Sequence, residues 1–422
     1  MNTSNSRFEK KIKNGIRVVL YYRPNSPITT DAIIHSGSKF DPKKTPGFSH
    51  FFEHLVVNGS EKFPTKDLLA EHIESVGGFF GAMTSQDSIT IRTEIPDKND
   101  YERVVDIFEA TLSKPSLDKK YFDNEKNVVI KEIKMSQSNP HRILIRVCRE
   151  LFFKETSFEH DVLGTSESIS KIDYKETVLN YEKWFDRKRI TFVASGDILI
   201  DDLVNHLDKL NLNESNEDLP EVIISNEGVN NNILNSFIDI PQTHLCFGFL
   251  SPMSFTKDML HLTLLGDILA GGRSSRLTKK LRYEKGLIYS IQSQRVGGVE
   301  KGLFGFFTST EDDKVQDVIN EIISEIKNIK EKGITDFELN FIKSKKIKSL
   351  KRSMQTSNSW VDFHEVDEIF TKGDYTIDTY IEEIENTKID DIKIIIDKYF
   401  GEDNWKLAMC GKTKTEDIKI KF

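Results

Sequence analysis

The alternation of apolar and polar positions predicts a chain built from short strands and amphipathic helices. In the first half, runs rich in β-branched and aromatic residues predict strands at 17–23, 30–34, 79–85, 89–95 and 190–194. Apolar residues recurring every three or four positions predict helices at 65–76, 100–112, 119–135, 141–153, 174–185 and 201–210. One more helix is expected between Thr45, a suitable cap that precedes Pro46, and the stop signal Asn58-Gly59.

The second half of the chain repeats this order of elements. The expected elements are a strand at 237–249, helices at 259–269 and from 273 through Arg282, strands at 287–293 and 303–309, helices at 314–330, 336–354 and 360–370, a charged helical stretch to 399, and a strand at 405–409. The repeat predicts an α+β fold of two homologous domains, each a mixed, mostly antiparallel sheet with helices packed on it. One large α+β domain is the alternative.

The boundary between the two predicted domains falls in a stretch of different composition. Residues 211–232 are rich in Asn and Glu and carry no sustained period, which is typical of a linker. We therefore expect a first domain at 1–210, a linker at 211–232 and a second domain at 233–422.

The most informative stretch is 47–59, GFSHFFEHLVVNG, inside the first predicted helix. Each helical residue advances by about 100°, so His54 lies about 40° from His50, and Glu53 lies about 60° away on the other side. The opposite face carries only apolar side chains, those of Phe51, Phe52, Leu55 and Val56. We expect one side of this helix to be buried and the other to present two imidazoles and a carboxylate.

Two histidines four residues apart on a helix can share one zinc ion, and a neighbouring carboxylate that is not a ligand can accept a proton from the metal's water. His-x-x-Glu-His is the inverted order of the commoner zinc-protease motif. A surface helix with two solvated histidines is the alternative. His261 lies in the corresponding helix of the second half, but no Glu-His follows it, so we expect no metal site there.

A catalytic zinc usually has three protein ligands, and the helix at 119–135 offers a candidate for the third. Glu125, Val128, Val129 and Glu132 share one face of that helix. Burying an ionised glutamate costs free energy unless a cation lies close to its carboxylate, and a metal ion would be such a cation. The alternative is that Glu125 and Glu132 lie at the rim of the apolar stripe, solvated or paired with lysines.

Composition excludes several classes of protein. The net charge of −8 is modest for 422 residues and the basic residues are scattered, so no nucleic-acid partner is expected. No apolar run reaches membrane-spanning length, and residues 1–15 contain no apolar segment of a signal peptide, which predicts a cytoplasmic protein without a membrane partner. Cys148, Cys246 and Cys410 are far apart and odd in number, so we interpret them as buried thiols in a reducing compartment.

Several separated motifs resemble those of the pitrilysin superfamily, which includes insulin-degrading enzyme, the mitochondrial processing peptidase and small bacterial processing peptidases. GFSHFFEH is followed by NEKNVVIKE, which places Glu125 and Glu132 at the family's spacing. GGRSSRLTKKLRYEKGLIYS in the second half resembles the segment in which an Arg and a Tyr reach towards the zinc site, here Arg282 and Tyr289. The resemblance covers nearly the whole chain.

The resemblance implies a role for each matching residue. His50, His54 and Glu132 would bind one zinc ion per chain, Glu53 would be the general base, and Glu125 would orient a ligand. Residues 79–85 would be an edge strand to which a peptide adds, with Gly81, Ala82 and Thr84 in contact with the substrate. Arg282 and Tyr289 would hold the substrate and stabilise the oxyanion. The family usually has Asn before Ala in the edge strand, and Gly81 departs from that pattern.

These implications predict a zinc-dependent endopeptidase that cleaves peptides or unfolded segments inside a chamber. Because the chain carries both the zinc motif and the Arg/Tyr segment, we expect a homodimer in which Arg282 and Tyr289 act on the zinc site of the other subunit. A heterodimer with a related subunit is the rival arrangement. A weakly active or non-catalytic peptide-binding subunit, and a metal hydrolase of another substrate class, are the rival functions.

Overall fold

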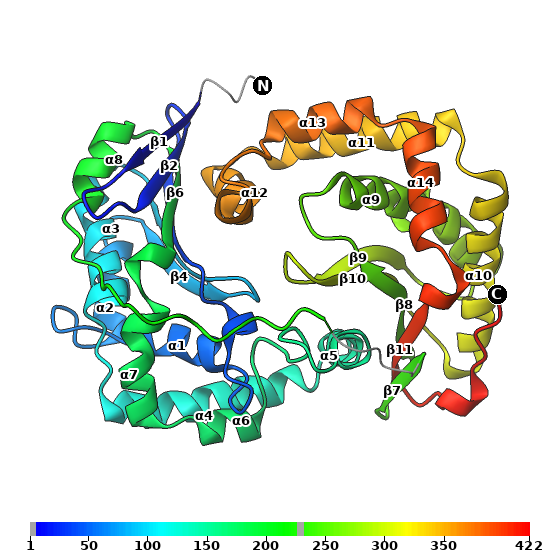
Figure 1. The fold of residues 1–422 in the computed structure, drawn as a ribbon, viewed down its shortest axis with the longest axis horizontal. Coiled ribbons are helices and arrows are strands. Elements are labelled where there is room, and N and C mark those ends of the chain that lie inside the picture. The colour runs from blue at the N-terminus through cyan, green and yellow to red at the C-terminus, as the bar shows by residue number, and fades with distance from the viewer. Residues whose placement is uncertain (1–5, 226–231) are drawn as a thin grey trace. The chain divides into compact units, whose positions relative to one another are not determined.

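The computed structural model describes residues 6–225 and 232–422, and its contacts divide the chain into two compact units. Unit 1 comprises the described residues up to Ile133, together with Asp161–Val222 and Leu350–Tyr380. Unit 2 comprises Lys134–His160, the described residues of Ile223–Ser349, and Ile381–Phe422. Each unit contains one sheet covered by helices, so the predicted fold of two α+β domains is confirmed (Figure 1).

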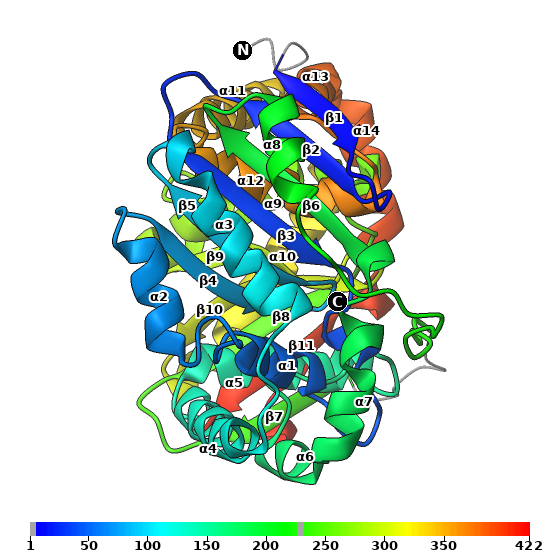
Figure 2. The same ribbon diagram turned by 90° about the vertical axis from the view of Figure 1, so that its left-hand side faces the viewer.

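Unit 1 is organised around a six-stranded sheet with the order β1-β2-β6-β3-β5-β4 (Figure 2). The strands are β1 (Arg7–Lys11), β2 (Arg17–Tyr22), β3 (Ile28–Ile34), β4 (Phe79–Thr84), β5 (Ile89–Ile95) and β6 (Ile190–Gly196). In this sheet β2 and β6 are parallel, and the other neighbours are antiparallel. Strand β4 therefore lies at an open edge of the sheet.

Helices from the first half of the chain cover one face of this sheet. They are α1 (Phe48–Val56), α2 (Lys66–Glu74), α3 (Tyr101–Phe108), α4 (Lys119–Ser136, which ends in unit 2), α6 (Ser166–Lys171), α7 (Tyr174–Trp184) and α8 (Ile200–Leu207). Alternate residues of β3, such as Ala32 and Ile34, join the helices in one buried apolar core. This core fixes the position of α1 against the sheet.

The other face of the first sheet is covered by a helix from the far end of the chain. Helix α12 (Ser357–Phe370), drawn in orange in Figure 1, packs on β6 and β3. Its fully buried Glu368 accepts hydrogen bonds from Arg7 Nε at 2.9 Å, Arg17 Nη2 at 2.8 Å and the Tyr21 hydroxyl at 2.6 Å. A buried carboxylate needs such partners, so this network ties α12 to β1 and β2.

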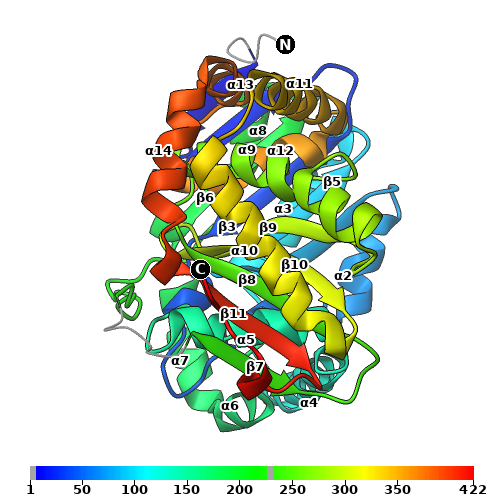
Figure 3. The same ribbon diagram turned by 90° about the vertical axis from the view of Figure 1, so that its right-hand side faces the viewer.

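Unit 2 is organised around a five-stranded sheet with the order β7-β11-β8-β10-β9 (Figure 3). Its strands are β7 (Ile233–Phe237), β8 (Thr243–Ser251), β9 (Ile291–Gly297), β10 (Gly302–Thr310) and β11 (Lys406–Gly411). The first pair is parallel and the rest are antiparallel. The run β2-β6-β3-β5-β4 has the same sequence of pairings, so the two sheets are built on one plan.

The helices of unit 2 come from three stretches of chain. They are α5 (Pro140–Phe153), α9 (Lys257–Ala270), α10 (Val315–Lys332), α11 (Asp336–Ser353, which ends in unit 1) and α14 (Ile389–Tyr399), while α13 (Ile377–Asn386) begins in unit 1 and ends in unit 2. Helix α5 packs on β11, β8 and β7. The three cysteines, Cys148 on α5, Cys246 on β8 and Cys410 on β11, are free and buried as expected.

Neither unit is a single stretch of sequence. Residues 134–160 lie in unit 2 and residues 350–380 lie in unit 1, so the units differ from the expected domains 1–210 and 233–422. The physical reason is that each sheet buries its second face under a helix from the other half of the chain. Periodicity shows that a helix has an apolar face but does not show which sheet that face covers.

Several predicted elements differ from the structure at their ends. The strand expected at 237–249 is two strands, β7 and β8, which are separated at residues 238–242 around Pro241. Strand β1 was not predicted, and the strand expected at 287–293 begins only at Ile291. Part of the expected linker, 226–231, lies outside the described residues. In the described ranges 6–225 and 232–422, no helix has both the length and the apolar character required to cross a membrane.

Candidate metal centre

The helix α1 is held in unit 1 by its apolar face. Phe51, Phe52, Leu55 and Val56 are at most 2% exposed. Phe52 and Phe48 contact the ring of Trp184, with centroids 5.8 and 5.0 Å away. The indole N–H of Trp184 donates to Ser49 Oγ at 3.1 Å. The predicted amphipathic helix is therefore confirmed, and its histidine side faces away from this core.

The first turn of α1 is fixed by Asp41 and not by Thr45. Asp41 accepts hydrogen bonds from the backbone amides of Gly47 at 2.7 Å and Ser49 at 2.8 Å, and from the Ser49 hydroxyl at 2.6 Å. Burial raises the pKa of Asp41 to about 7, although these hydrogen bonds favour its ionised form. Gly47 precedes the helix at φ 91°, and a Cβ there would lie 2.6 Å from the carbonyl oxygen of Leu163. Only glycine fits this position.

Helix α4 lies against α1 through aromatic and aliphatic contacts. The Phe122 ring meets the Phe51 ring edge-on with centroids 5.1 Å apart, and Val129 is fully buried. Val128, expected on the same face, is 44% exposed and lies at the edge of the stripe. This packing brings Glu125 and Glu132 of α4 beside the histidines of α1.

Three side chains converge on one point. Glu132 Oε2 lies 3.8 Å from His50 Nε2 and 3.5 Å from His54 Nε2. The imidazole centroids are 4.7 Å apart. Ligand atoms that surround a zinc ion tetrahedrally at its usual bond lengths lie about 3.3 Å from one another. The observed separations exceed a good hydrogen bond and match the spacing of ligands around an ion.

Glu125 forms a hydrogen bond with His54 at the ring nitrogen that does not face Glu132. Glu125 Oε2 lies 3.0 Å from His54 Nδ1, which leaves Nε2 directed towards Glu132. Burial is the largest influence on the pKa of His54 and lowers it, but hydrogen bonds with Glu125 and Glu132 and the charge of Glu53 outweigh burial and raise the pKa to about 9. A carboxylate that orients a metal-binding imidazole in this way is a common feature of zinc sites.

Glu53 lies beside the converging side chains and has a different partner. One ligand atom from each of His50, Glu53 and His54 lies within 4.8 Å of the others. Glu53 Oε2 accepts a hydrogen bond of 2.7 Å from the hydroxyl of Thr84 on β4. Burial raises the pKa of Glu53, and the bond from Thr84 opposes the shift. Glu132 Oε2 lies near the Nε2 atoms of both histidines, whereas Glu53 is bonded to β4, and the roles of Glu132 as ligand and Glu53 as base remain predictions.

The predicted substrate strand is an edge strand. Gly81, Ala82 and Thr84 lie on β4, which is the last strand of its sheet and pairs with β5. Ala82 packs against the apolar core, and Thr84 contacts Glu53. The strand therefore reaches the candidate centre directly, while contact with a substrate remains a prediction.

Arg282 and Tyr289 lie in unit 2. Arg282 belongs to the π-helical segment Thr278–Glu284, and Tyr289 follows in the passage to β9. The guanidinium carbon of Arg282 lies 4.6 Å from the centre of the Tyr289 ring, and Tyr289 is 75% exposed. The two residues therefore contact each other, and their action on a zinc site remains a prediction.

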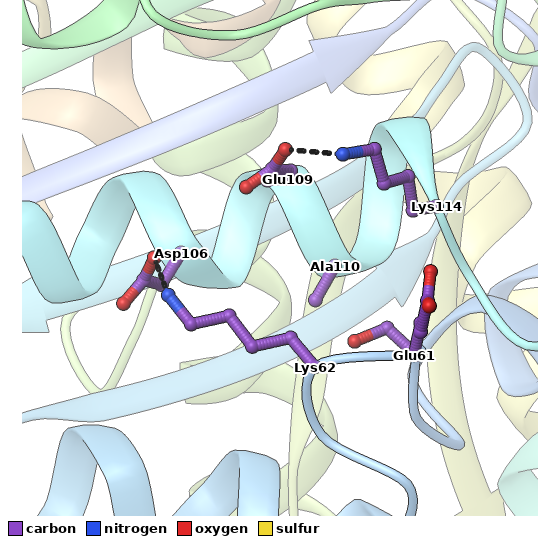
Figure 4. A pocket seen from close by; sticks show the side chains of 7 residues that line it. Glu61, Lys62, Asp106, Glu109, Ala110 and Lys114 are labelled. Carbon is purple, nitrogen blue, oxygen red and sulfur yellow. Dashed lines mark hydrogen bonds and ion pairs between the residues drawn. The ribbon is translucent and has the colours of Figure 1, made fainter.

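A second charged group in unit 1 has no metal-binding arrangement. A cleft of about 230 Å³ between the loop after α1 and helix α3 contains Lys62, Asp106, Glu109 and Lys114 (Figure 4). Lys62 pairs with Asp106, and Lys114 pairs with Glu109 at 2.9 Å. Both Asp106 and Glu109 already have a cationic partner, so this cleft does not compete with the centre on α1 and α4.

Two contributions to the centre were missed in the sequence. Asp41 lies outside the predicted helix, and no spacing rule connects it with Gly47 and Ser49. The hydrogen bond from Thr84 to Glu53 was not predicted, and contact of Thr84 with a substrate remains a prediction. The sequence predicted a strand at 79–85, but it did not show that one face of this strand meets α1.

Comparison with known proteins agrees with this fold. The family described as Insulinase (Peptidase family M16) matches residues 17–166, and the family described as Peptidase M16 inactive domain matches residues 171–346. An uncharacterized zinc protease of Bacillus subtilis is 24% identical over 403 residues, which cover 94% of this chain and 97% of that protein. The mitochondrial-processing peptidase subunit beta of Saccharomyces cerevisiae is 24% identical over 376 residues, which cover 83% of this chain and 79% of that protein.

A solved structure shows the same fold. The crystal structure of a protease from Helicobacter pylori superposes with a TM-score of 0.88 at 18% identity, and covers 96% of this chain and 99% of that one. Two α+β units with an inverted His-x-x-Glu-His helix define a peptidase scaffold of the pitrilysin type. The chain belongs to the M16 family of peptidases, as both family matches together span most of its length.

Proposed function

We propose that this protein is a zinc-dependent endopeptidase that cleaves peptides or unfolded polypeptide segments. The observation that carries the proposal is the convergence of His50 Nε2, His54 Nε2 and Glu132 Oε2 at separations suited to one zinc ion. When bound, zinc would supply a Lewis acid that polarises the scissile carbonyl and acidifies water. Two imidazoles and one carboxylate would occupy three of the four coordination positions of zinc, which leaves the fourth position open as in a catalytic site.

The remaining chemistry belongs to side chains of this chain. Glu53 accepts the proton of the attacking water and then donates it to the leaving amine. Its raised pKa suits this role, because it makes the carboxylate a stronger base. Glu125 keeps the Nε2 atom of His54 directed inwards. An extended peptide pairs with the open edge of β4. Arg282 and Tyr289 stabilise the negative charge that develops on the carbonyl oxygen.

The test compares the wild type with Glu53→Gln and His54→Ala. Glu53→Gln should abolish cleavage of a quenched peptide library and keep one zinc per chain by metal analysis. His54→Ala should lose the zinc as well. Undiminished cleavage by Glu53→Gln would contradict the proposal.

A non-catalytic or weakly active peptide-binding subunit is the second candidate function. Its support is the likeness to a protein that is named as a subunit, the mitochondrial-processing peptidase subunit beta. The intact set of His50, Glu53, His54 and Glu132 favours the enzyme. Zinc content without peptide cleavage would favour the subunit, and chelator-sensitive peptide cleavage would exclude both the subunit and a hydrolase of other substrates.

The proposal includes a homodimer in which Arg282 and Tyr289 of one subunit serve the zinc of the other. Its support is that one chain carries both the centre on α1 and α4 and the Arg/Tyr pair. Mixing Glu53→Gln chains with Tyr289→Phe chains should restore part of the activity. No restoration in a mixture shown to exchange subunits would favour action within one chain or a heterodimer with a related subunit.

A cytoplasmic location completes the proposal. Its support is the set of three buried free thiols, which suits a reducing compartment. Fractionation of the producing cells, with the protein detected by antibody, tests this part independently of activity.

A further inference from the structure

The two faces of strand β4 are chemically different. The amide of Ser85, just after the strand, donates to the carbonyl of Ser88 at 2.8 Å, which directs its backbone groups towards β5. Backbone direction alternates along an antiparallel strand, so Phe79, Gly81 and Met83 also direct theirs towards β5. The backbone groups of the intervening residues, Phe80, Ala82 and Thr84, therefore point to the open edge of the sheet.

The side chains follow the same alternation. Phe80 and Ala82 pack against the core on the side of α1, and Thr84 bonds to Glu53. Phe79 and Met83 point to the other face and are 51% and 45% exposed. These two large apolar side chains flank Gly81, which has none.

The ring of Phe79 lies over Gly81. A Cβ atom built on Gly81 would be 2.9 Å from Cζ and 3.2 Å from Cε1 of Phe79. The ring therefore fills the space that a side chain at position 81 would occupy. Phe79, Gly81 and Met83 lie on one face of β4, which we call the Phe79–Met83 face.

The charges beside this face are mainly negative. The cross-strand neighbours of Phe79 and Gly81 on β5 are Glu94 and Arg92. Arg92 is bound by Asp31 at 2.6 Å and by Asp362 at 2.7 Å. With Glu94 added, the carboxylates on this side outnumber the guanidinium of Arg92, so an acidic side chain placed here would be repelled.

We propose that the Phe79–Met83 face is a specificity subsite that selects peptides with a large apolar side chain opposite Gly81 and disfavours acidic ones. A peptide residue that pairs with Gly81 projects its side chain on the same face as Gly81. There it contacts the Phe79 ring and reaches Met83 diagonally. The subsite rests on the proposed peptidase function, and adds a preference at one position of the substrate.

An aromatic ring over an edge glycine can also serve only to shield the backbone. That structural role would affect stability or overall activity, but it would not change the relative preference for one peptide over another. The ratio of kcat/KM for two peptides that differ in a single residue therefore separates the two roles.

The experiment uses quenched peptides in which each position around the cleaved bond carries either Leu or Asp. The wild type should prefer Leu at the position opposite Gly81. Phe79→Ser should reduce that Leu/Asp ratio by about two- to fivefold, the effect of one favourable cross-strand pair, and leave the ratio at adjacent positions unchanged. Gly81→Ala should act in the same direction because its methyl group displaces the ring.

Phe8→Ser is the matched control, because Phe8 is also an exposed phenylalanine, 42% accessible, on β1 at the opposite edge of the same sheet. Phe8→Ser should leave every ratio unchanged. Equal ratios in the wild type and Phe79→Ser at all positions would overturn the subsite, as would the same change in Phe8→Ser.

The failure of the peptidase proposal is distinguishable from the failure of the subsite. Absence of any cleavage by the zinc-loaded wild type would overturn the peptidase proposal. The subsite is then decided by anisotropy, with fluorescent Leu and Asp peptides binding to the same zinc-loaded chain. A Leu preference that falls in Phe79→Ser supports the subsite, and an unchanged preference overturns it.

Discussion

The hydroxyl of Thr84 donates a hydrogen bond of 2.7 Å to Oε2 of Glu53. The open edge strand and the helix that carries both histidines therefore meet at the candidate general base. Thr84 belongs to the strand that would hold the substrate, and its hydrogen bond opposes the rise in the pKa of Glu53 that burial causes.

Removing this hydroxyl should shift the acid limb of the pH profile. Burial raises the pKa of Glu53 and the bond from Thr84 lowers it, so Thr84→Val should raise the pKa further. Less Glu53 is then ionised at a given acidic pH, and kcat/KM should begin to fall at a higher pH than in the wild type. Thr84→Ser keeps the donor and should retain the wild-type profile. Coincident acid limbs for Thr84→Val and the wild type would contradict this role.

Glu125→Gln should weaken zinc binding while the three ligands stay in place. Replacing a carboxylate that orients a metal-binding imidazole typically lowers affinity by about 10- to 100-fold. Competition with a chromophoric chelator measures the change. Glu167→Gln is the control, because Glu167 is 77% exposed and pairs with Lys171 on the same helix. Equal affinities for both variants would argue against the orienting role.

Zinc binding should depend on pH through His54. The pKa of His54 in the metal-free chain is raised to about 9, so zinc must displace a proton at any lower pH. Apparent affinity should gain about tenfold per pH unit between pH 6.5 and 9 from this group, and then level off. If the apparent zinc affinity levelled off near pH 6.5 instead, His54 would not be paired with Glu125 and Glu132.

The same pKa predicts the stability of the metal-free chain. Because the folded pKa lies above the unfolded value, the stabilisation from protonated His54 is complete below about pH 6.5 and is lost as the pH rises through 9. The urea concentration at the unfolding midpoint of the metal-free protein, measured between pH 6.5 and 9, checks whether stability falls as the pH rises. Glu125→Gln should flatten the dependence, because it removes one of the carboxylate charges that raise the pKa of His54.

Glu368→Gln should destabilise unit 1. The fully buried carboxylate faces Arg7 and Arg17, and removing one member of a buried ion pair costs about 3 kcal/mol. Chemical unfolding of the full chain measures the loss. Glu102→Gln removes a carboxylate that is 56% exposed and should change stability by less than about 1 kcal/mol. Similar losses in both variants would mean that α12 is not anchored through Glu368.

The sequence predicted the centre because its residues repeat at helical spacing on two helices. His50, Glu53 and His54 share a face of α1 by periodicity alone, and Glu125 and Glu132 share a face of α4. The family resemblance then indicated that these two faces meet. Without it, the periodicity allowed the two glutamates to pair with lysines at the surface.

Contacts between residues far apart in the sequence could not be predicted in this way. Asp41 caps α1 from outside any helical pattern, and Glu368 completes a network with strands more than 300 residues earlier. The position of the Phe79 ring over Gly81 depends on a side-chain rotamer. Each of these features follows from tertiary packing, which a local pattern of apolar positions does not encode.

The exchange of α5 and α12 between the units has a consequence for biosynthesis. The first sheet receives its last helix from residues 350–380, after most of the second sheet has been translated. At ordinary elongation rates, the ribosome needs roughly 6 to 26 seconds to travel from the end of 161–222 to the start of that segment. Nascent chains therefore expose one face of the first sheet during this interval, and a chain truncated after residue 210 would leave that face without its cover permanently.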